Sequence, residues 1–328
     1  MRLITRSLTN ENVTLTAYLL DQSNEMRNTH NRPAILIFPG GAYRGCSDRE
    51  AEPVAMAFLA EGYQAFVLRY SLNHNACFPK PLNDAEEALE LIRDNSQQWG
   101  VDPTKVAVCG FSAGGHLASA LGTMGRIRPD AMILGYPQIL ATTSSIFPSP
   151  LPGIDTAVDA ATPTAFIFHT FEDTLVPVNN ALALASALEQ FKVPFDLHIF
   201  RNGVHGLSLA APVTSGGLRS MVDGDAAKWF DLCISWLKKV FGEFASDQDI
   251  LLDENISEYD IDVQLGVLLK NPACKTLIYQ ALPMLENSPQ LQDALQVSIR
   301  QINEWGGEIA SQEVMEQLNF DLKAIPLD

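Results

Sequence analysis

Short apolar runs alternate with segments of helical periodicity along most of the chain. The runs are rich in Val, Ile, Leu and Phe, which is typical of strands covered on both faces. They lie at residues 34–38, 64–68, 106–109, 131–135, 165–169 and 195–200. Apolar positions recur at helical spacing over residues 50–61, 84–98, 116–122, 180–190 and 226–240. Strands alternating with helices predict an α/β fold with a doubly wound, mostly parallel sheet.

Two segments depart from this alternation. The run Val13–Leu19 alternates between apolar and polar residues, which predicts an edge strand in a hairpin with Leu3–Leu8. Residues 137–163 carry five prolines and no clear period. We therefore expect an irregular insertion over the carboxyl edge of the sheet, where ligands bind in folds of this class.

The last quarter of the chain differs in charge. Residues 246–328 hold 15 Asp/Glu and 4 Lys/Arg, whereas residues 1–245 hold 24 and 18. Helical segments are expected at residues 260–269, 274–285, 290–305 and 311–318. We therefore expect a catalytic domain over residues 1–245 and an acidic helical appendage over residues 246–328.

Composition narrows the possible partners and cofactors. The 328 residues carry a formal net charge of −17, which argues against nucleic acid or an anionic membrane surface as a partner. No run reaches the roughly 18 apolar residues of a membrane span, and no apolar leader segment follows Met1–Ser7. The five cysteines form no CxxC pair, so neither a disulfide framework nor a zinc site is expected. These features favour the reducing cytoplasm.

The motif Gly110–Gly114, Gly-Phe-Ser-Ala-Gly, is the first candidate for chemistry. A match to G-x-S-x-G is weak alone, but this one follows a buried-type strand and opens a helix, as a nucleophile elbow does. The helix N-terminus would then face a developing negative charge. Ser112 is therefore the predicted nucleophile, and an ordinary glycine-rich turn is the alternative.

A serine nucleophile needs a base and an acid that orients the base. His205 lies in a loop after the last predicted strand and can return to the elbow, so we predict it as the base. His116 and His169 fit helix packing and a strand end better. Asp173 lies just past the strand 165–169 and is the predicted acid, with Glu172 as its rival. A helix cap is the other interpretation of Asp173.

An acyl transfer also needs N–H donors for the tetrahedral oxyanion. The segment Pro39–Tyr43 follows an early strand, and its small residues let backbone N–H groups converge on a ligand. We expect Gly41 and Ala42, together with Ala113 after the nucleophile, to supply the donors. Gly40 is a further possible donor, and an ordinary βα turn without a role in binding is the alternative interpretation.

Taken together, these motifs resemble those of α/β-hydrolase esterases, and more narrowly of the bacterial acetylxylan-esterase-like branch. The resemblance spans about residues 30–240 and rests on Pro39–Tyr43, Ser47–Glu50, Leu68–Tyr70, Pro81–Ala85, Gly110–His116, Asp173–Pro177 and Gly203–Gly206. It implies Ser112 as nucleophile, Asp173 as acid and His205 as base. Related esterases commonly begin the oxyanion loop with His, where this chain has Pro39; backbone donors are unaffected. The helical tail lies outside the resemblance.

We therefore expect a serine carboxylic-ester hydrolase that works through an acyl-enzyme, without metal or organic cofactor. The short insertion and the resemblance favour a small acyl group, such as acetyl on a carbohydrate. A prolyl-oligopeptidase-type peptidase shares the order of the triad, although such enzymes usually carry a large extra domain. A catalytically inactive binding module is the other alternative. The expected partners are a small ester and, through the appendage, a further copy of the chain.

Overall fold

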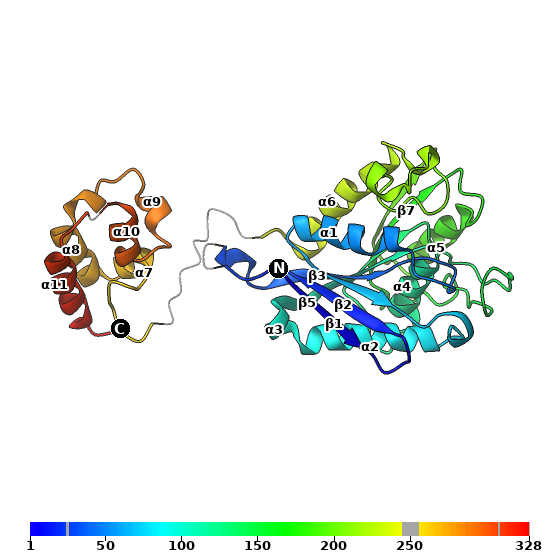
Figure 1. The fold of residues 1–328 in the computed structure, drawn as a ribbon, viewed down its shortest axis with the longest axis horizontal. Coiled ribbons are helices and arrows are strands. Elements are labelled where there is room, and N and C mark those ends of the chain that lie inside the picture. The colour runs from blue at the N-terminus through cyan, green and yellow to red at the C-terminus, as the bar shows by residue number, and fades with distance from the viewer. Residues whose placement is uncertain (24–25, 245–255, 308, 328) are drawn as a thin grey trace. The chain divides into compact units, whose positions relative to one another are not determined.

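An eight-stranded sheet organises the first part of the chain in the computed structural model (Figure 1). Its strand order is β1-β2-β4-β3-β5-β6-β7-β8. β1 and β4 each pair antiparallel with β2, and all other neighbours are parallel. The predicted α/β class and mostly parallel sheet are confirmed. The strands are β1 Arg2–Ser7, β2 Thr14–Leu19, β3 Arg32–Phe38, β4 Gln64–Arg69, β5 Val101–Phe111, β6 Ala131–Gly135, β7 Thr164–Thr170 and β8 Phe195–Phe200.

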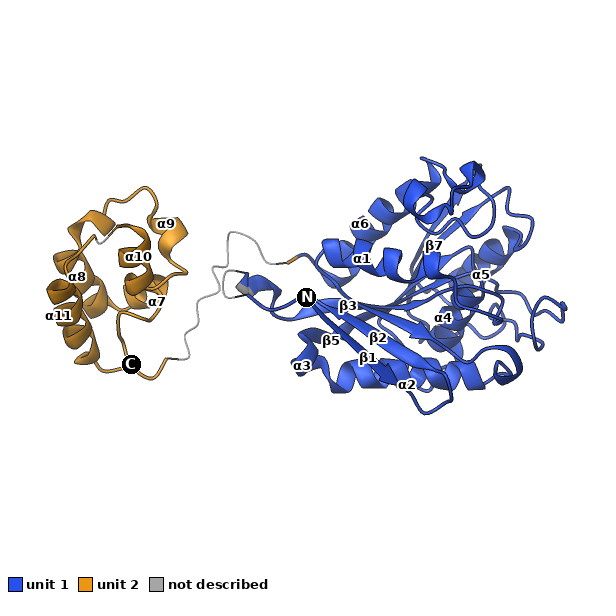
Figure 2. Cartoon of the chain, in the orientation of Figure 1, with its two compact units in different colours: residues 1–243 blue, residues 244–328 orange. Residues whose placement is uncertain are grey.

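The structure describes residues 1–23, 26–244, 256–307 and 309–327. They divide into unit 1, residues 1–243, and unit 2, residues 244–328 (Figure 2). The boundary that we expected between residues 245 and 246 lies outside the described residues. Each unit is considered by itself below.

Helices cover both faces of the sheet in unit 1 (Figure 1). Successive residues of a strand point to opposite faces, and in β3 Leu36 belongs to one core whereas Ile37 belongs to the other. The first core includes Leu89, Leu117 and Leu184 of α2, α4 and α5, and the second includes Phe58 and Trp236 of α1 and α6. The helices are α1 Glu52–Ala60, α2 Lys80–Asp94, α3 Ser96–Trp99, α4 Ala113–Met124, α5 Asn179–Gln190 and α6 Trp229–Phe241.

Two predictions about unit 1 were wrong in detail. The segment 13–19 forms a hairpin with the N-terminal strand, but β1 is the edge, because β2 also pairs with β4. The expected helix 84–98 is divided into α2 and α3, and α2 begins at Lys80 because Pro81 is tolerated in a first turn. The helix expected after the serine is confirmed, because α4 begins at Ala113 and contains residues 116–122.

The insertion at residues 137–163 is irregular, as predicted. The structure describes all of these residues, and their only strand-like contact is the isolated bridge between Thr142 and Leu151. Asn180 holds the beginning of the insertion, since its Oδ1 accepts the N–H groups of Ile139 and Leu140 at 2.9 and 3.0 Å. Arg44 donates to the carbonyl oxygens of Ser145 and Ile146 and so links the insertion to the loop after β3.

Unit 2 has an apolar core of its own. Its buried members come from several helices and the segment before them: Tyr259, Ile261, Leu265, Leu268, Cys274, Ile278, Leu282, Leu285, Ile299, Met315, Leu318 and Leu322. The helices are α7 Leu265–Lys270, α8 Pro272–Ala281, α9 Leu291–Ala294, α10 Ile299–Trp305 and α11 Gln312–Lys323. An isolated antiparallel bridge joins Gln264 and Ser298, the N-caps of α7 and α10.

Polar capping residues explain where the predicted helices of unit 2 were wrong. The helix expected at 290–305 is divided into α9 and α10, because Ser298 adopts an extended conformation and forms a capping box with Gln301. The helix expected from residue 260 begins at Leu265, since Asp260 accepts the N–H groups of Asp262 and Val263 in a turn. The last helix extends to Lys323 rather than ending at residue 318.

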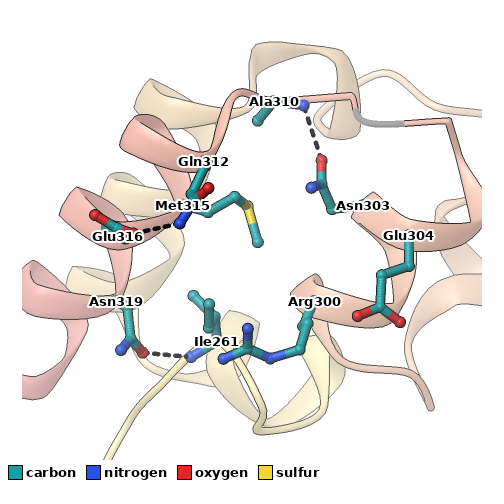
Figure 3. Close-up of a pocket in the computed structure, with 9 residues that line it drawn as sticks. All are labelled: Ile261, Arg300, Asn303, Glu304, Ala310, Gln312, Met315, Glu316 and Asn319. Carbon is teal, nitrogen blue, oxygen red and sulfur yellow. Dashed lines mark hydrogen bonds between the residues drawn. The ribbon is translucent and has the colours of Figure 1, made fainter.

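A hollow of about 420 Å³ lies in unit 2 (Figure 3). Its polar walls come from α10 and α11, and Ile261, Ala310 and Met315 contribute apolar atoms. Asn303 and Asn319 accept the N–H groups of Ala310 and Ile261, so these amides hold the walls in place. The hollow is therefore bounded by fixed segments of the unit.

Candidate active site

Ser112 occupies a sharp turn between β5 and α4. Its backbone has φ 53° and ψ −116°, a conformation that side-chain-bearing residues seldom adopt. Its N–H donates to the Gly135 carbonyl oxygen and its own carbonyl oxygen accepts the N–H of Gln138, which fixes the turn on β6. A Cβ at Gly114 would lie 1.9 Å from the Phe38 carbonyl oxygen, so only glycine lets the helix approach β3 this closely.

Ser112, His205 and Asp173 meet at the carboxyl edge of the sheet. Ser112 Oγ lies 2.8 Å from His205 Nε2, and His205 Nδ1 lies 2.6 Å from Asp173 Oδ2. A carboxylate only accepts, so Nδ1 carries the proton and Nε2 is left to accept from the serine hydroxyl. The arrangement can therefore take a proton from Ser112 and hold the resulting imidazolium next to a carboxylate.

Asp173 is positioned by the turn that follows β7. Its side chain is fully buried, and its Oδ1 accepts the N–H groups of Leu175 and Val176 at 2.9 and 3.0 Å. Oδ2 is thereby directed to His205. Glu172, the rival acid, is exposed and instead accepts the N–H of Gly203 at 3.3 Å.

The loop after β3 runs against the serine. A Cβ placed on Gly40 would lie 3.0 Å from Ser112 Cβ. Gly41, Ala42 and Tyr43 have φ values of 138°, 53° and 58°, and three successive positive φ values turn the chain sharply here. The structure thus brings the segment Pro39–Tyr43 to the elbow.

The N–H groups of this region fall into two classes. Those of Gly41, Ala42 and Ala113 have no acceptor in the part of the chain that the structure describes. Ala113 opens α4, where the first N–H groups lack intrahelical partners. The Gly40 N–H, in contrast, donates to the buried Glu50 carboxylate at 2.8 Å. Of the donors left open by the sequence, Gly40 is therefore already engaged.

Buried hydrogen bonds support the loop from below. Tyr70 donates its hydroxyl to the Pro39 carbonyl oxygen at 2.6 Å. His116 lies between Tyr43 and Pro152: its Nε2 donates to the Pro152 carbonyl oxygen and its Nδ1 accepts the Tyr43 hydroxyl. Burial lowers the pKa of His116 to about 4, so the ring is neutral near pH 7. His116 thus joins the loop to the insertion rather than contacting Ser112.

Sequence analysis did not single out Glu50 or Tyr136 as site residues. Glu50 is buried and accepts hydrogen bonds from Gly40 and Tyr136, whose hydroxyl in turn accepts the N–H of Ser208. The available signal was their position: Glu50 follows the loop Pro39–Tyr43 closely, and Tyr136 follows β6 at the carboxyl edge. Their contact joins residues 86 positions apart, and no motif in the sequence links the two.

The described residues contain no group of three or more His, Cys, Asp and Glu side chains arranged to hold a metal ion. Among the same residues, no helix is long and apolar enough to cross a membrane.

Comparison with known proteins identifies the family. The BD-FAE family model matches residues 20–134. The crystal structure of MGS-M1, an α/β-hydrolase enzyme from a Medee basin deep-sea metagenome library, is 48% identical and superposes with a TM-score of 0.71. The alignment covers 74% of this chain and 99% of that one. The chain belongs to the α/β-hydrolase family. Its strand-to-helix turn at Ser112 is that of an α/β-hydrolase nucleophile elbow.

Two further relatives place this α/β-hydrolase in the acetylxylan-esterase-like branch. The acetylxylan esterase of Xylanibacter ruminicola is 32% identical over 195 residues, which are 53% of this chain and 40% of that protein. The structure of an acetyl ester-xyloside bifunctional hydrolase from Caldicellulosiruptor lactoaceticus is 36% identical with a TM-score of 0.60, covering 70% of this chain and 89% of that one. The chain spans a third of the length of the endo-1,4-beta-xylanase B of Butyrivibrio fibrisolvens and two fifths of the length of this acetylxylan esterase.

Proposed function

We propose that this α/β-hydrolase is a serine carboxylic-ester hydrolase that acts on acetyl esters of carbohydrates. The observation that carries the proposal is the hydrogen-bonded series Ser112–His205–Asp173 beside N–H groups that have no acceptor among the residues that the structure describes. A nucleophile, an oriented base and converging donors are the parts that acyl transfer requires. Neither a metal nor an organic cofactor enters the proposed reaction.

In the first half of the reaction, Ser112 Oγ attacks the ester carbonyl carbon while its proton moves to His205 Nε2. The carbonyl oxygen becomes an oxyanion, which accepts hydrogen bonds from Ala113 N–H and from Gly41 and Ala42. Asp173 stabilises the imidazolium through Nδ1–H. When the tetrahedral intermediate collapses, the C–O bond to the alcohol breaks and His205 gives its proton to the leaving oxygen. An acyl-Ser112 ester remains.

The second half repeats the sequence with water. His205 takes a proton from water as the water oxygen attacks the acyl carbon, and the same donors hold the second oxyanion. Collapse breaks the bond to Ser112 Oγ, which takes the proton back from His205. The products are a carboxylic acid and the free enzyme, so atoms and charge balance over the cycle.

The acetylated carbohydrate is proposed from the relatives and from the insertion. One relative is an acetylxylan esterase and one structural neighbour is an acetyl ester-xyloside hydrolase. Arg44 ties the insertion at residues 145–146 to the loop after β3, which favours a small acyl group at that side of Ser112. We further propose a cytoplasmic setting, based on cysteine content, and a role for unit 2 in shape or self-assembly rather than chemistry.

A substrate panel tests this proposal. Nitrophenyl esters of increasing acyl length, acetylated xylo-oligosaccharides and a prolyl nitroanilide are compared at equal protein concentration. We expect cleavage of the acetyl esters, a decline with acyl length and no cleavage of the anilide. Preferred cleavage of the anilide would instead indicate the peptidase. Absence of labelling by a fluorophosphonate would indicate an inactive binding module.

A further inference from the structure

A carboxyl group lies buried behind the oxyanion loop and takes no part in the reaction described above. Glu50 ends a 3-10 turn, Asp48–Glu50, and is only 2% exposed. Its Oε2 accepts the Gly40 N–H at 2.8 Å and its Oε1 accepts the Tyr136 hydroxyl at 2.6 Å. Buried charged groups are costly unless hydrogen bonds compensate them. Both carboxyl oxygens are compensated here, each by a different segment of the site.

The contact with Gly40 bears on the direction of the oxyanion donors. The Gly40 carbonyl oxygen accepts the N–H of Ser47 at 2.8 Å, so both peptide groups of Gly40 are held. The Gly40 carbonyl and the Gly41 N–H belong to one planar, trans peptide group and point in opposite directions. Holding the carbonyl on Ser47 therefore directs the Gly41 N–H away from Ser47, and this N–H has no acceptor among the described residues.

The contact with Tyr136 reaches the loop that carries the base. The Tyr136 hydroxyl donates to Glu50 and accepts the N–H of Ser208, three residues after His205, at 2.9 Å. The Ser208 hydroxyl donates to the Arg49 carbonyl oxygen, so the same loop is also bound beside Glu50. The rings of Tyr136 and His205 pack edge to face with centroids 5.2 Å apart.

We infer that Glu50 is a positioning residue that sets the oxyanion loop and the His205 loop relative to each other, through Gly40 on one side and Tyr136 on the other. The inference rests on the proposed ester hydrolysis and adds a residue that does not touch the substrate. The reason is geometric. The N–H donors must reach the carbonyl oxygen of the same ester group whose carbon the serine attacks with the help of the base, and one carboxylate holds the loops of both the donors and the base. A displacement of about 1 Å at such a site lowers the rate by about 100-fold.

Burial raises the pKa of the Glu50 carboxyl above its ordinary value, and the hydrogen bonds from Tyr136 and Gly40 offset part of that rise. The two hydrogen-bond partners are both donors, which matches an ionised carboxylate with two accepting oxygens. A glutamine at this position has the same shape but only one accepting oxygen. If its NH₂ group faced the Gly40 N–H, two donors would oppose each other. If it faced Tyr136, it would compete with the Ser208 N–H for the hydroxyl oxygen and leave the hydroxyl proton without its acceptor.

The test is Glu50→Gln: turnover of nitrophenyl acetate is measured on one aliquot, and the concentration of active sites is titrated with a fluorophosphonate on another. We expect kcat per titrated site to fall about 10- to 100-fold, with KM and the titrated fraction unchanged. Glu61→Gln, the same substitution at an exposed residue after α1, is the matched control and should behave as wild type. A merely structural role predicts instead a lower unfolding temperature and a smaller titrated fraction, with kcat per site unchanged, and that result would overturn the inference.

Tyr136→Phe removes one hydroxyl and keeps the ring, and it decides the matter even if Glu50→Gln does not fold. It should also lower kcat per titrated site without changing KM. Because both variants break one series of contacts, the double variant should lose little more than either single variant. Wild-type kcat per site in folded Tyr136→Phe, or fully additive losses, would contradict the inference.

The outcome for Glu50 can be separated from the outcome for the proposed function. If wild type does not cleave nitrophenyl acetate, or Ser112→Ala cleaves it equally well, the ester hydrolysis itself is wrong. If wild type is active, Ser112→Ala is inactive and Glu50→Gln equals wild type, only the positioning role fails.

Discussion

The carboxyl edge of the sheet in unit 1 and the hollow in unit 2 both gather polar side chains, but they use them differently. In unit 1 the Asp173 side chain is fully buried and that of His205 is 16% exposed, and both lie in series with one hydroxyl. In the hollow, the amide oxygens of Asn303 and Asn319 each accept a hydrogen bond from a backbone N–H group of the same unit (Figure 3). Polar lining alone therefore does not make a reactive site; convergence on one atom does.

The two units also differ in how their polar groups are supported. The site in unit 1 sits on loops after β3, β5, β6, β7 and β8, all anchored to one sheet with a core on each face. The hollow in unit 2 lies between short helices over a single small core. Strands that end at one edge let residues distant in sequence meet, which is why the chemistry is proposed for unit 1 alone.

The largest expected effect comes from removing the proposed nucleophile. Ser112→Ala should lower kcat on nitrophenyl acetate by a factor on the order of 10⁶, because triad members act as a unit. The control is Ser235→Ala, on the exposed side of α6. Circular dichroism should show both variants folded. Wild-type turnover by folded Ser112→Ala would contradict the proposal that the chemistry takes place at Ser112 in unit 1.

The next effect concerns the acid. Asp173→Asn keeps the shape of the side chain but favours the wrong tautomer of His205, and a loss on the order of 10⁴ in kcat is expected. Glu172→Gln is the adjacent control and should stay close to wild type, since Glu172 contacts Gly203 rather than His205. If kcat instead fell strongly in Glu172→Gln and little in Asp173→Asn, the acid would be Glu172.

A third prediction contrasts the buried polar groups of unit 1 with unit 2, which contains no histidine. Burial lowers the pKa of His116 from 6.5 to about 4. Below pH 6.5 the unfolded chain binds a proton that the native ring does not, so stability is full above pH 6.5 and is lost as the pH falls toward 4. Between pH 7 and pH 5 this linkage removes about 2 kcal/mol from the free energy of unfolding of unit 1.

Urea unfolding followed by tryptophan fluorescence measures this loss, since Trp99, Trp229 and Trp236 are buried in unit 1 whereas Trp305 of unit 2 is exposed. His116→Gln should be less stable than wild type at pH 7 but should lose less stability on going to pH 5. His74→Gln, at an exposed position, should retain the wild-type dependence. An unchanged dependence in His116→Gln would show that other groups carry the acid sensitivity.

The smallest effect is expected from removing unit 2. A chain that ends at residue 243 keeps both cores of unit 1 and all proposed catalytic residues. Its kcat/KM on nitrophenyl acetate should equal that of the full chain within error, while size-exclusion chromatography should show a changed assembly or solubility. A folded but inactive fragment would mean that unit 2 supplies part of the site.

Much of unit 1 could be predicted from the sequence because its signals are local. Apolar runs marked the buried strands, and a glycine-flanked serine after such a run marked the elbow. The positions of His205 and Asp173 followed from strands that end at one edge. The role of Glu50 was not predicted, because a glutamate before a helix is ordinarily exposed and the burial of this one depends on Gly40 and Tyr136.

The helices of unit 2 were harder to delimit for a related reason. Apolar spacing continues through residues 290–305, so periodicity alone predicted one helix. Ser298 nevertheless starts a new one through its capping box, and its N–H is used by Gln301. A single polar residue thus overrides a periodic signal when its side chain satisfies the backbone.

The most direct test of the proposed acyl-enzyme is the mass of the protein during turnover. Wild type is mixed with an acetyl ester, quenched in acid within the first turnovers, and digested for mass spectrometry. We expect a mass gain of one acetyl group on the peptide that contains Ser112, and none in Ser112→Ala. Turnover without an acetylated peptide, or acetylation of a different residue that persists in Ser112→Ala, would contradict the mechanism.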